Sequence, residues 1–128
     1  MMIPNFRGSL QERMKKLKSL LAEKEEIKLV GSSFGGLMAA IFAMENESSV
    51  DSLVLLAPAL NFLENSGCQL RKISIPVCIY HGSEDEVIPI KTVEKVAEKY
   101  FSALSFYSVA DNHFLHNSFK KIDWQDLL

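Results

Sequence analysis

Apolar residues occur in two patterns along this chain: a spacing of three to four residues, typical of helices, and short continuous runs. Between positions 10 and 21, leucines and a methionine recur at helical spacing, with lysines on the other side, which predicts an amphipathic surface helix over residues 10–25. Ser9 and Glu12 form the pattern of a capping box at its start. A solvated face is a more common explanation of the lysines than a membrane or partner surface.

Two apolar runs predict buried strands, over residues 51–57 and 76–80, and residues 104–109 predict a further strand. A helix over residues 90–102 joins the last two, with Val93, Val96, Ala97 and Tyr100 facing inward. Strands that alternate with helices predict a parallel sheet. We therefore expect an α/β protein of one domain, residues 1–128. We expect a three-layer α/β/α sandwich with a mainly parallel sheet, whose strand order runs outward from residues 27–30.

Residues 27–40, IKLVGSSFGGLMAA, predict a strand, a tight turn and a helix in direct succession. This is the context in which the pattern G-x-S-x-G forms a nucleophile elbow, with Ser33 at the tip. Gly31 and Gly35 are expected where the backbone leaves no room for a side chain. The Phe34 N–H, at the start of the helix, is expected to point to where an oxyanion forms.

The same loop has two other interpretations. Gly-Ser-Ser segments also serve as plain connections between a strand and a helix, and Gly-rich loops can cradle phosphate. The sequence contains neither G-x-x-x-x-G-K-[ST] nor G-x-G-x-x-G in register, which disfavours the phosphate interpretation.

Composition narrows the classes of function. The chain has 128 residues and a formal net charge of -2, so it lacks the basic character of a nucleic-acid-binding protein. No apolar run reaches membrane-spanning length, and no signal-peptide pattern opens the sequence, so we expect a cytoplasmic protein without membrane partners. Cys68 and Cys78 form no metal-ligand motif, and Cys78, inside an apolar run, is expected to be a buried free thiol.

Three predicted strands are followed by residues of complementary chemistry: Ser33, Asp85 and His113. The carboxyl ends of parallel strands share one edge of a sheet, so residues distant in sequence can meet there. Serine needs a base within hydrogen-bond reach, histidine can take and return the proton, and a carboxylate fixes the histidine tautomer.

Neighbouring residues offer alternatives for the nucleophile and the acid. Ser32 adjoins Ser33, but no glycine lies two residues before it. Glu84 and Glu86 flank Asp85, and the whole acidic segment could be a solvated loop. We favour Asp85 by its position.

The remaining histidines have simpler explanations. His81 ends a strand and is expected to shape the acid loop. His113 and His116 could form a metal pair on a helix, but no third ligand is in register. Asp111 is expected to be a turn residue rather than a second acid.

Together these motifs resemble those of the α/β-hydrolase superfamily, as in a small serine esterase. The matching segments are G-S-S-F-G-G around Ser33, H-G-S-E-D-E-V-I-P around Asp85 and D-N-H-F around His113, in the family's order of nucleophile, acid and histidine. The resemblance implies hydrolysis of a small-molecule carboxylic ester or thioester through an acyl-enzyme intermediate. It implies an oxyanion donor at Phe34 and no cofactor or metal.

The resemblance also implies missing parts. Residues 4–8, PNFRG, resemble the family's turn after its fourth strand, so the chain is expected to lack the first three strands. The loop after the third strand supplies the family's second oxyanion donor. The missing strand leaves an exposed edge beside residues 27–30, and we expect a homodimer through it. The competing hypotheses are an inactive α/β-hydrolase-like interaction module and a flavodoxin-like phosphate or nucleotide binder.

Overall fold

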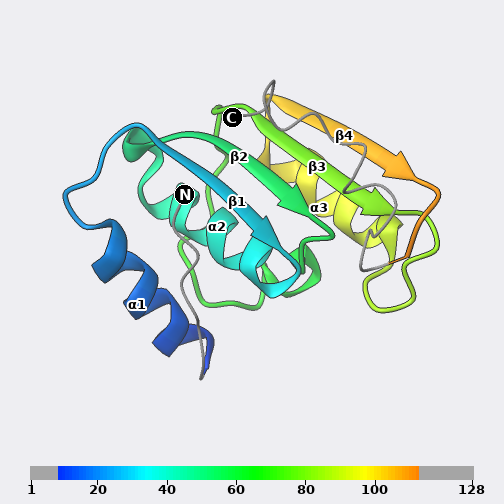
Figure 1. Ribbon diagram of the computed structural model, residues 1–128, viewed down its shortest axis with the longest axis horizontal. Coiled ribbons are helices and arrows are strands. Elements are labelled where there is room, and N and C mark those ends of the chain that lie inside the picture. The colour runs from blue at the N-terminus through cyan, green and yellow to red at the C-terminus, as the bar shows by residue number, and fades with distance from the viewer. Residues whose placement is uncertain (1–8, 113–128) are drawn as a thin grey trace.

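The computed structural model describes residues 9–112, which form a four-stranded sheet in the order β1-β2-β3-β4 (Figure 1). All three strand pairs are parallel. The predicted α/β class, parallel sheet and strand order are confirmed, and the four carboxyl ends lie at one edge of the sheet. The strands are β1 Ile27–Ser32, β2 Val50–Leu56, β3 Val77–Gly82 and β4 Leu104–Val109.

Three α-helices contribute to one large apolar core with one face of this sheet. In Figure 1, α2 and α3 lie behind the strands and α1 lies outside α2. The opposite face carries a smaller buried cluster of strand and loop residues, and no residue of α1, α2 or α3 belongs to it. A third layer on that face, as the predicted sandwich requires, would lie outside the described residues. The helices are α1 Leu10–Leu21, α2 Phe34–Glu45 and α3 Ile90–Tyr100, with 3₁₀ helices η1 Glu47–Ser49 and η2 Leu60–Phe62.

The first helix is shorter than the sequence pattern predicted. Its start is as expected, because the Ser9 hydroxyl accepts a hydrogen bond from the Glu12 N–H at 3.2 Å. It ends at Leu21, not at residue 25, and Glu23 has a left-handed φ of 65°. The exposed residues 22–26 offer no apolar side chain to the core, so nothing offsets the cost of continuing the helix.

Helix α2 is buried on all sides along most of its length. Every residue from Gly36 to Met44 is buried. One side packs on the sheet and the other is covered by α1, where Lys18 pairs with Glu45 at 3.0 Å. A helix that is apolar all round is typical of such a central position. This central helix begins at the proposed nucleophile and holds it against the sheet.

Helix α3 and strand β4 agree closely with the prediction. The buried residues of α3 are the four that the periodicity selected, and β4 has the predicted bounds. No helix among the described residues combines the length and the apolar character needed to cross a membrane.

Candidate active site

Ser33 lies at the sharp turn between β1 and α2. Its backbone has φ 53° and ψ -116°, a conformation that non-glycine residues rarely adopt. The turn is held from both sides: the Ser33 N–H donates to the Leu56 carbonyl at 2.9 Å, and the Ser33 carbonyl accepts from the Ala59 N–H at 2.9 Å. The strain is therefore fixed by the strand and loop next to it. This is the local geometry of a nucleophile elbow.

Two glycines make the turn sterically feasible, and one of them is not the residue that the sequence indicated. A Cβ atom on Gly31 would lie 2.4 Å from the Gly35 carbonyl oxygen, and one on Gly36 would lie 2.6 Å from Cβ of Pro58. A Cβ atom on Gly35 would meet nothing within 4 Å. The expectation was right for Gly31 and wrong for Gly35. The second close approach is between α2 and the loop after β2, which the G-x-S-x-G pattern does not describe.

Phe34 is the first residue of α2. The first N–H groups of an α-helix have no acceptor within the helix, and they lie at its positive end. Because Phe34 directly follows the tip of the turn, its N–H lies next to Ser33. On the side-chain side, the guanidinium of Arg13 lies 4.5 Å from the centre of the Phe34 ring and ties α1 to this turn.

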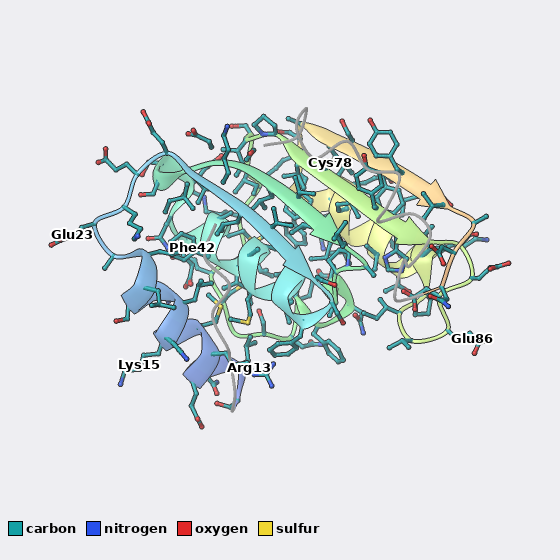
Figure 2. All side chains as sticks on the ribbon, viewed as in Figure 1. Arg13, Lys15, Glu23, Phe42, Cys78 and Glu86 are labelled. Carbon is teal, nitrogen blue, oxygen red and sulfur yellow. The ribbon has the colours of Figure 1, made fainter. Side chains whose placement is uncertain are left out.

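Asp85 is the buried carboxylate of the loop after β3. It is 8% exposed, whereas Glu84 and Glu86 are exposed, and Figure 2 shows Glu86 at the outer rim of the loop. Its Oδ1 accepts hydrogen bonds from the N–H groups of Val87 at 2.8 Å and Ile88 at 2.7 Å. These contacts satisfy an ionised carboxylate and distinguish Asp85 from its acidic neighbours.

His81, the last residue but one of β3, lies beneath this loop and is fully buried. Its Nε2 lies 2.7 Å from the Ile88 carbonyl oxygen and 3.1 Å from Oδ2 of Asp85. The expectation that His81 shapes the acid loop is confirmed by these contacts.

The loops after β3 and β4 are joined directly. The Ser83 N–H donates to the Val109 carbonyl at 2.8 Å, and the Glu84 N–H donates to the Asp111 carbonyl at 3.1 Å. A Cβ atom on Gly82 would lie 2.2 Å from that Asp111 oxygen, so glycine is required where the loops touch. Asp85 and the chain up to Asn112 are thereby brought together. His113 lies outside the described residues, as do His116 and residues 4–8.

Among residues 9–112, no group of three histidine, cysteine or acidic side chains is placed to hold a metal ion. Both cysteines are free, and Cys78 is buried as expected.

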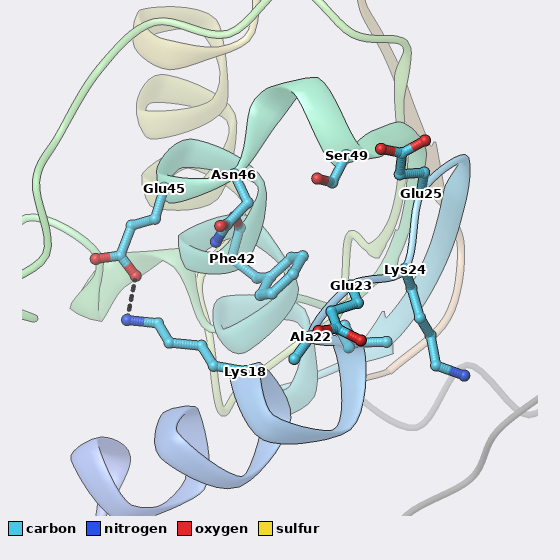
Figure 3. A pocket seen from close by; sticks show the side chains of 10 residues that line it. Lys18, Ala22, Glu23, Lys24, Glu25, Phe42, Glu45, Asn46 and Ser49 are labelled. Carbon is cyan, nitrogen blue, oxygen red and sulfur yellow. Dashed lines mark hydrogen bonds and ion pairs between the residues drawn. The ribbon is translucent and has the colours of Figure 1, made fainter.

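A cavity of about 510 Å³ lies away from Ser33, at the far end of α2. Figure 3 shows the Lys18–Glu45 ion pair at its margin and the Phe42 ring facing the turn after α1. A helix of this length, 12 residues, spans about 18 Å, so the cavity is remote from the elbow.

Several solved structures share this fold. A predicted CIB-like hydrolase from Thermoplasma acidophilum is 22% identical with a TM-score of 0.74, and the match covers 94% of this chain and 60% of that one. An alpha-beta serine hydrolase homologue from Coxiella burnetii is 25% identical with a TM-score of 0.67, covering 86% of this chain and 53% of that one. Alpha/beta hydrolase domain-containing protein 10 from mouse is 18% identical with a TM-score of 0.75, covering 94% and 70%. The chain thus spans little more than half the length of the first two structures.

No curated protein sequence matches the chain significantly. The family model of the dienelactone hydrolases, in contrast, matches residues 5–118, which include the elbow, the acid loop and position 113. The structural matches and this alignment agree with the superfamily that the sequence motifs indicated. The chain belongs to the dienelactone hydrolase family, within the α/β-hydrolase superfamily.

Proposed function

We propose that this chain is a serine hydrolase that cleaves a small carboxylic ester or thioester through an acyl-enzyme intermediate. The observation that carries the proposal is the left-handed backbone of Ser33, φ 53°, fixed between β1 and α2. Backbone strain of this kind costs on the order of 1–3 kcal/mol and persists where the surroundings enforce it. A plain connection between a strand and a helix does not require it.

The proposed reaction has two halves. Ser33 Oγ attacks the carbonyl carbon while His113 takes its proton, and the oxyanion accepts a hydrogen bond from the Phe34 N–H. The intermediate then collapses, the bond to the leaving group breaks, and His113 returns the proton to that group. Water attacks the acyl-enzyme in the same way and releases the acid and free Ser33. Asp85 keeps the imidazole in the required tautomer.

The spacing of the strands supports this assignment. Ser33 follows β1 and Asp85 follows β3, with β2 between them. Neighbouring strands lie about 4.8 Å apart, so the ends of β1 and β3 are about 10 Å apart. That separation is too large for a direct hydrogen bond but leaves room for an imidazole between the hydroxyl and the carboxylate. Asn112, directly before His113, is part of the loop joined to the acid loop.

We propose that this chain alone hydrolyses its substrate slowly. Phe34 supplies one oxyanion donor, and β1 is an edge strand within the described sheet. Removal of one oxyanion donor typically slows an enzyme by about a hundred- to a thousandfold. We therefore propose that a partner or further chain beside β1 supplies the second donor. A homodimer through this edge is the arrangement that the sequence suggested.

A burst experiment with a p-nitrophenyl acyl ester tests the proposal. We expect one equivalent of nitrophenol per chain in a fast phase, followed by slow turnover, because nitrophenol is a good leaving group and acylation of Ser33 is then faster than hydrolysis of the acyl-enzyme. Ser33→Ala should abolish the burst, and the matched control Ser32→Ala should retain it. A folded wild-type protein that releases no nitrophenol above the buffer rate, in a burst or in steady turnover, would favour the inactive interaction module. Retention of the burst in Ser33→Ala would disprove the assignment of the nucleophile.

We also propose a cytoplasmic location, which the two free thiols, Cys68 and Cys78, support. Fractionation of the source cells tests this: recovery with an oxidising compartment would contradict it.

A further inference from the structure

The proposed reaction gives His81 no role, although its ring contacts the Asp85 carboxylate. Its side chain is fully buried, and Nε2 lies 2.7 Å from the Ile88 carbonyl oxygen and 3.1 Å from Oδ2 of Asp85. A buried polar ring is costly unless its hydrogen bonds are satisfied. A leucine would fill the same place without that cost.

The contacts of His81 define its tautomer. The Ile88 carbonyl oxygen can only accept, so Nε2 carries the proton. Nδ1 is buried and has no hydrogen-bond partner within the described residues. A proton on Nδ1 would have no acceptor among the described residues, so these contacts favour the tautomer with the proton on Nε2. Nε2–H of His81 therefore donates to the Ile88 carbonyl, and Nδ1 is buried where a substrate cannot reach it.

The second contact restrains the Asp85 carboxylate. Backbone N–H groups of Val87 and Ile88 both bind Oδ1, so these two contacts act on one oxygen of the carboxylate. The His81 ring lies against Oδ2, the other oxygen, so it opposes rotation of the carboxylate plane. A carboxylate oxygen accepts more than one hydrogen bond, so Oδ2 retains capacity for a catalytic imidazole.

The same histidine also closes the loop. Ile88 is 3% exposed and belongs to the main core, and its N–H and carbonyl bind Asp85 and His81 respectively. The acid is thus held between the end of β3 and a residue anchored in the core. Loss of the ring would loosen the carboxylate at Oδ2 and free the Ile88 carbonyl together.

We propose that His81 is a positioning residue of the hydrolase: its ring, with Nε2 3.1 Å from Oδ2, fixes the plane of the Asp85 carboxylate so that Oδ2 faces the catalytic histidine. This inference rests on the proposed function. It assigns to His81 an effect on nucleophile activation, beyond the stability of the loop.

Glutamine and asparagine provide a matched test, because each places an amide N–H near the position of a different nitrogen of the histidine ring. The amide nitrogen of glutamine lies the same number of bonds from Cα as Nε2, whereas that of asparagine corresponds to Nδ1. His81→Gln can donate to the Ile88 carbonyl and to Asp85, and His81→Asn cannot reach them from the same backbone. His81→Leu fills the space without a donor.

The measurement is the second-order rate constant for labelling by a fluorophosphonate, with kcat, KM and the melting temperature of each variant. We expect His81→Gln to label within about threefold of the wild-type rate. We expect His81→Asn and His81→Leu to label about ten- to a hundredfold more slowly, the scale of one lost polar contact with a charged group, with the loss in kcat and not KM.

Two results would overturn the role of His81 and leave the proposed function intact. One is labelling of His81→Leu at the wild-type rate, and the other is equal labelling rates for the glutamine and asparagine variants. If His81→Leu fails to fold, the amide pair still decides, measured well below the melting temperature of both. A wild-type protein that is folded and does not label would overturn the proposed function, and with it this inference.

Discussion

The elbow geometry makes opposite predictions for two glycines of the same motif. In Gly31→Ala, the new Cβ atom would lie 2.4 Å from the Gly35 carbonyl oxygen, 2.7 Å from the Gly35 carbonyl carbon and 2.9 Å from the Gly36 Cα. All three atoms are backbone, so no side chain can rotate away. An ordinary contact begins at 3.4 Å, so β1 and α2 must separate by about 1 Å.

The cost follows from the packing around this turn. Overpacking in a tight core typically costs about 1–3 kcal/mol. Because residues 36–44 of helix α2 are all buried and the helix cannot shift alone, we expect the upper end, about 3 kcal/mol. Gly35→Ala adds a methyl group that meets nothing within 4 Å, in the first turn of a helix, and should stabilise by up to about 1 kcal/mol.

Urea unfolding followed by far-ultraviolet circular dichroism measures both effects. With a denaturant slope of about 1.5 kcal/mol/M, a loss of 3 kcal/mol lowers the midpoint by about 2 M. Gly35→Ala should have a midpoint equal to or above that of the wild type. If Gly31→Ala unfolds at the wild-type midpoint, or if both variants lose the same stability, the steric account of the elbow is wrong.

Three further predictions concern the rest of the molecule. Burial raises the pKa of the Cys78 thiol, so a disulfide reagent at neutral pH should label the half-buried Cys68 first, and equal rates would contradict the burial of Cys78. Hydrogen bonds from Lys99 and Tyr100 lower the pKa of the Glu64 carboxyl in the folded protein. The stability that this carboxylate contributes is therefore fully present above its unfolded pKa of about 4.3. It is lost as the pH falls through the lower folded pKa. Glu64→Gln should therefore flatten the decrease in urea midpoint across the acid range, and an unchanged profile would refute this. If β1 pairs with a second copy, sedimentation velocity should show a dimer that Val30→Lys, a charge on the edge strand, converts to monomer; a wild-type monomer at high concentration would rule this pairing out.

The fold was largely predictable because hydrophobic periodicity reports burial directly. The four inward residues of α3 and the bounds of β4 were predicted correctly. Periodicity does not indicate the burial of α2, which carries glycines, alanines and large apolar residues on every side. The position of α1, which covers the side of α2 away from the sheet, explains this composition. Periodicity also overestimated the length of α1, because the exposed residues 22–25 fit a helix pattern but contribute no side chain to the core.

The candidate site was predictable in type, and less so in detail. The G-x-S-x-G pattern located Ser33, but local sequence cannot show that the α2 backbone meets Pro58, so it selected Gly35 where the structure requires Gly36. The contact between His81 and Asp85 depends on how the acid loop folds back to Ile88. The H-G-x-x-D segment was the available signal, since a histidine four residues before the acid can reach it across a tight turn.

The central claim is that Ser33 is an activated nucleophile. Its most direct test is the intact mass of the protein after treatment with a fluorophosphonate, beside Ser33→Ala and Ser32→Ala. The account predicts one adduct per chain on the wild type and on Ser32→Ala, and none on Ser33→Ala. A folded wild-type protein that gains no mass would contradict it, as would an adduct that persists when Ser33 is replaced.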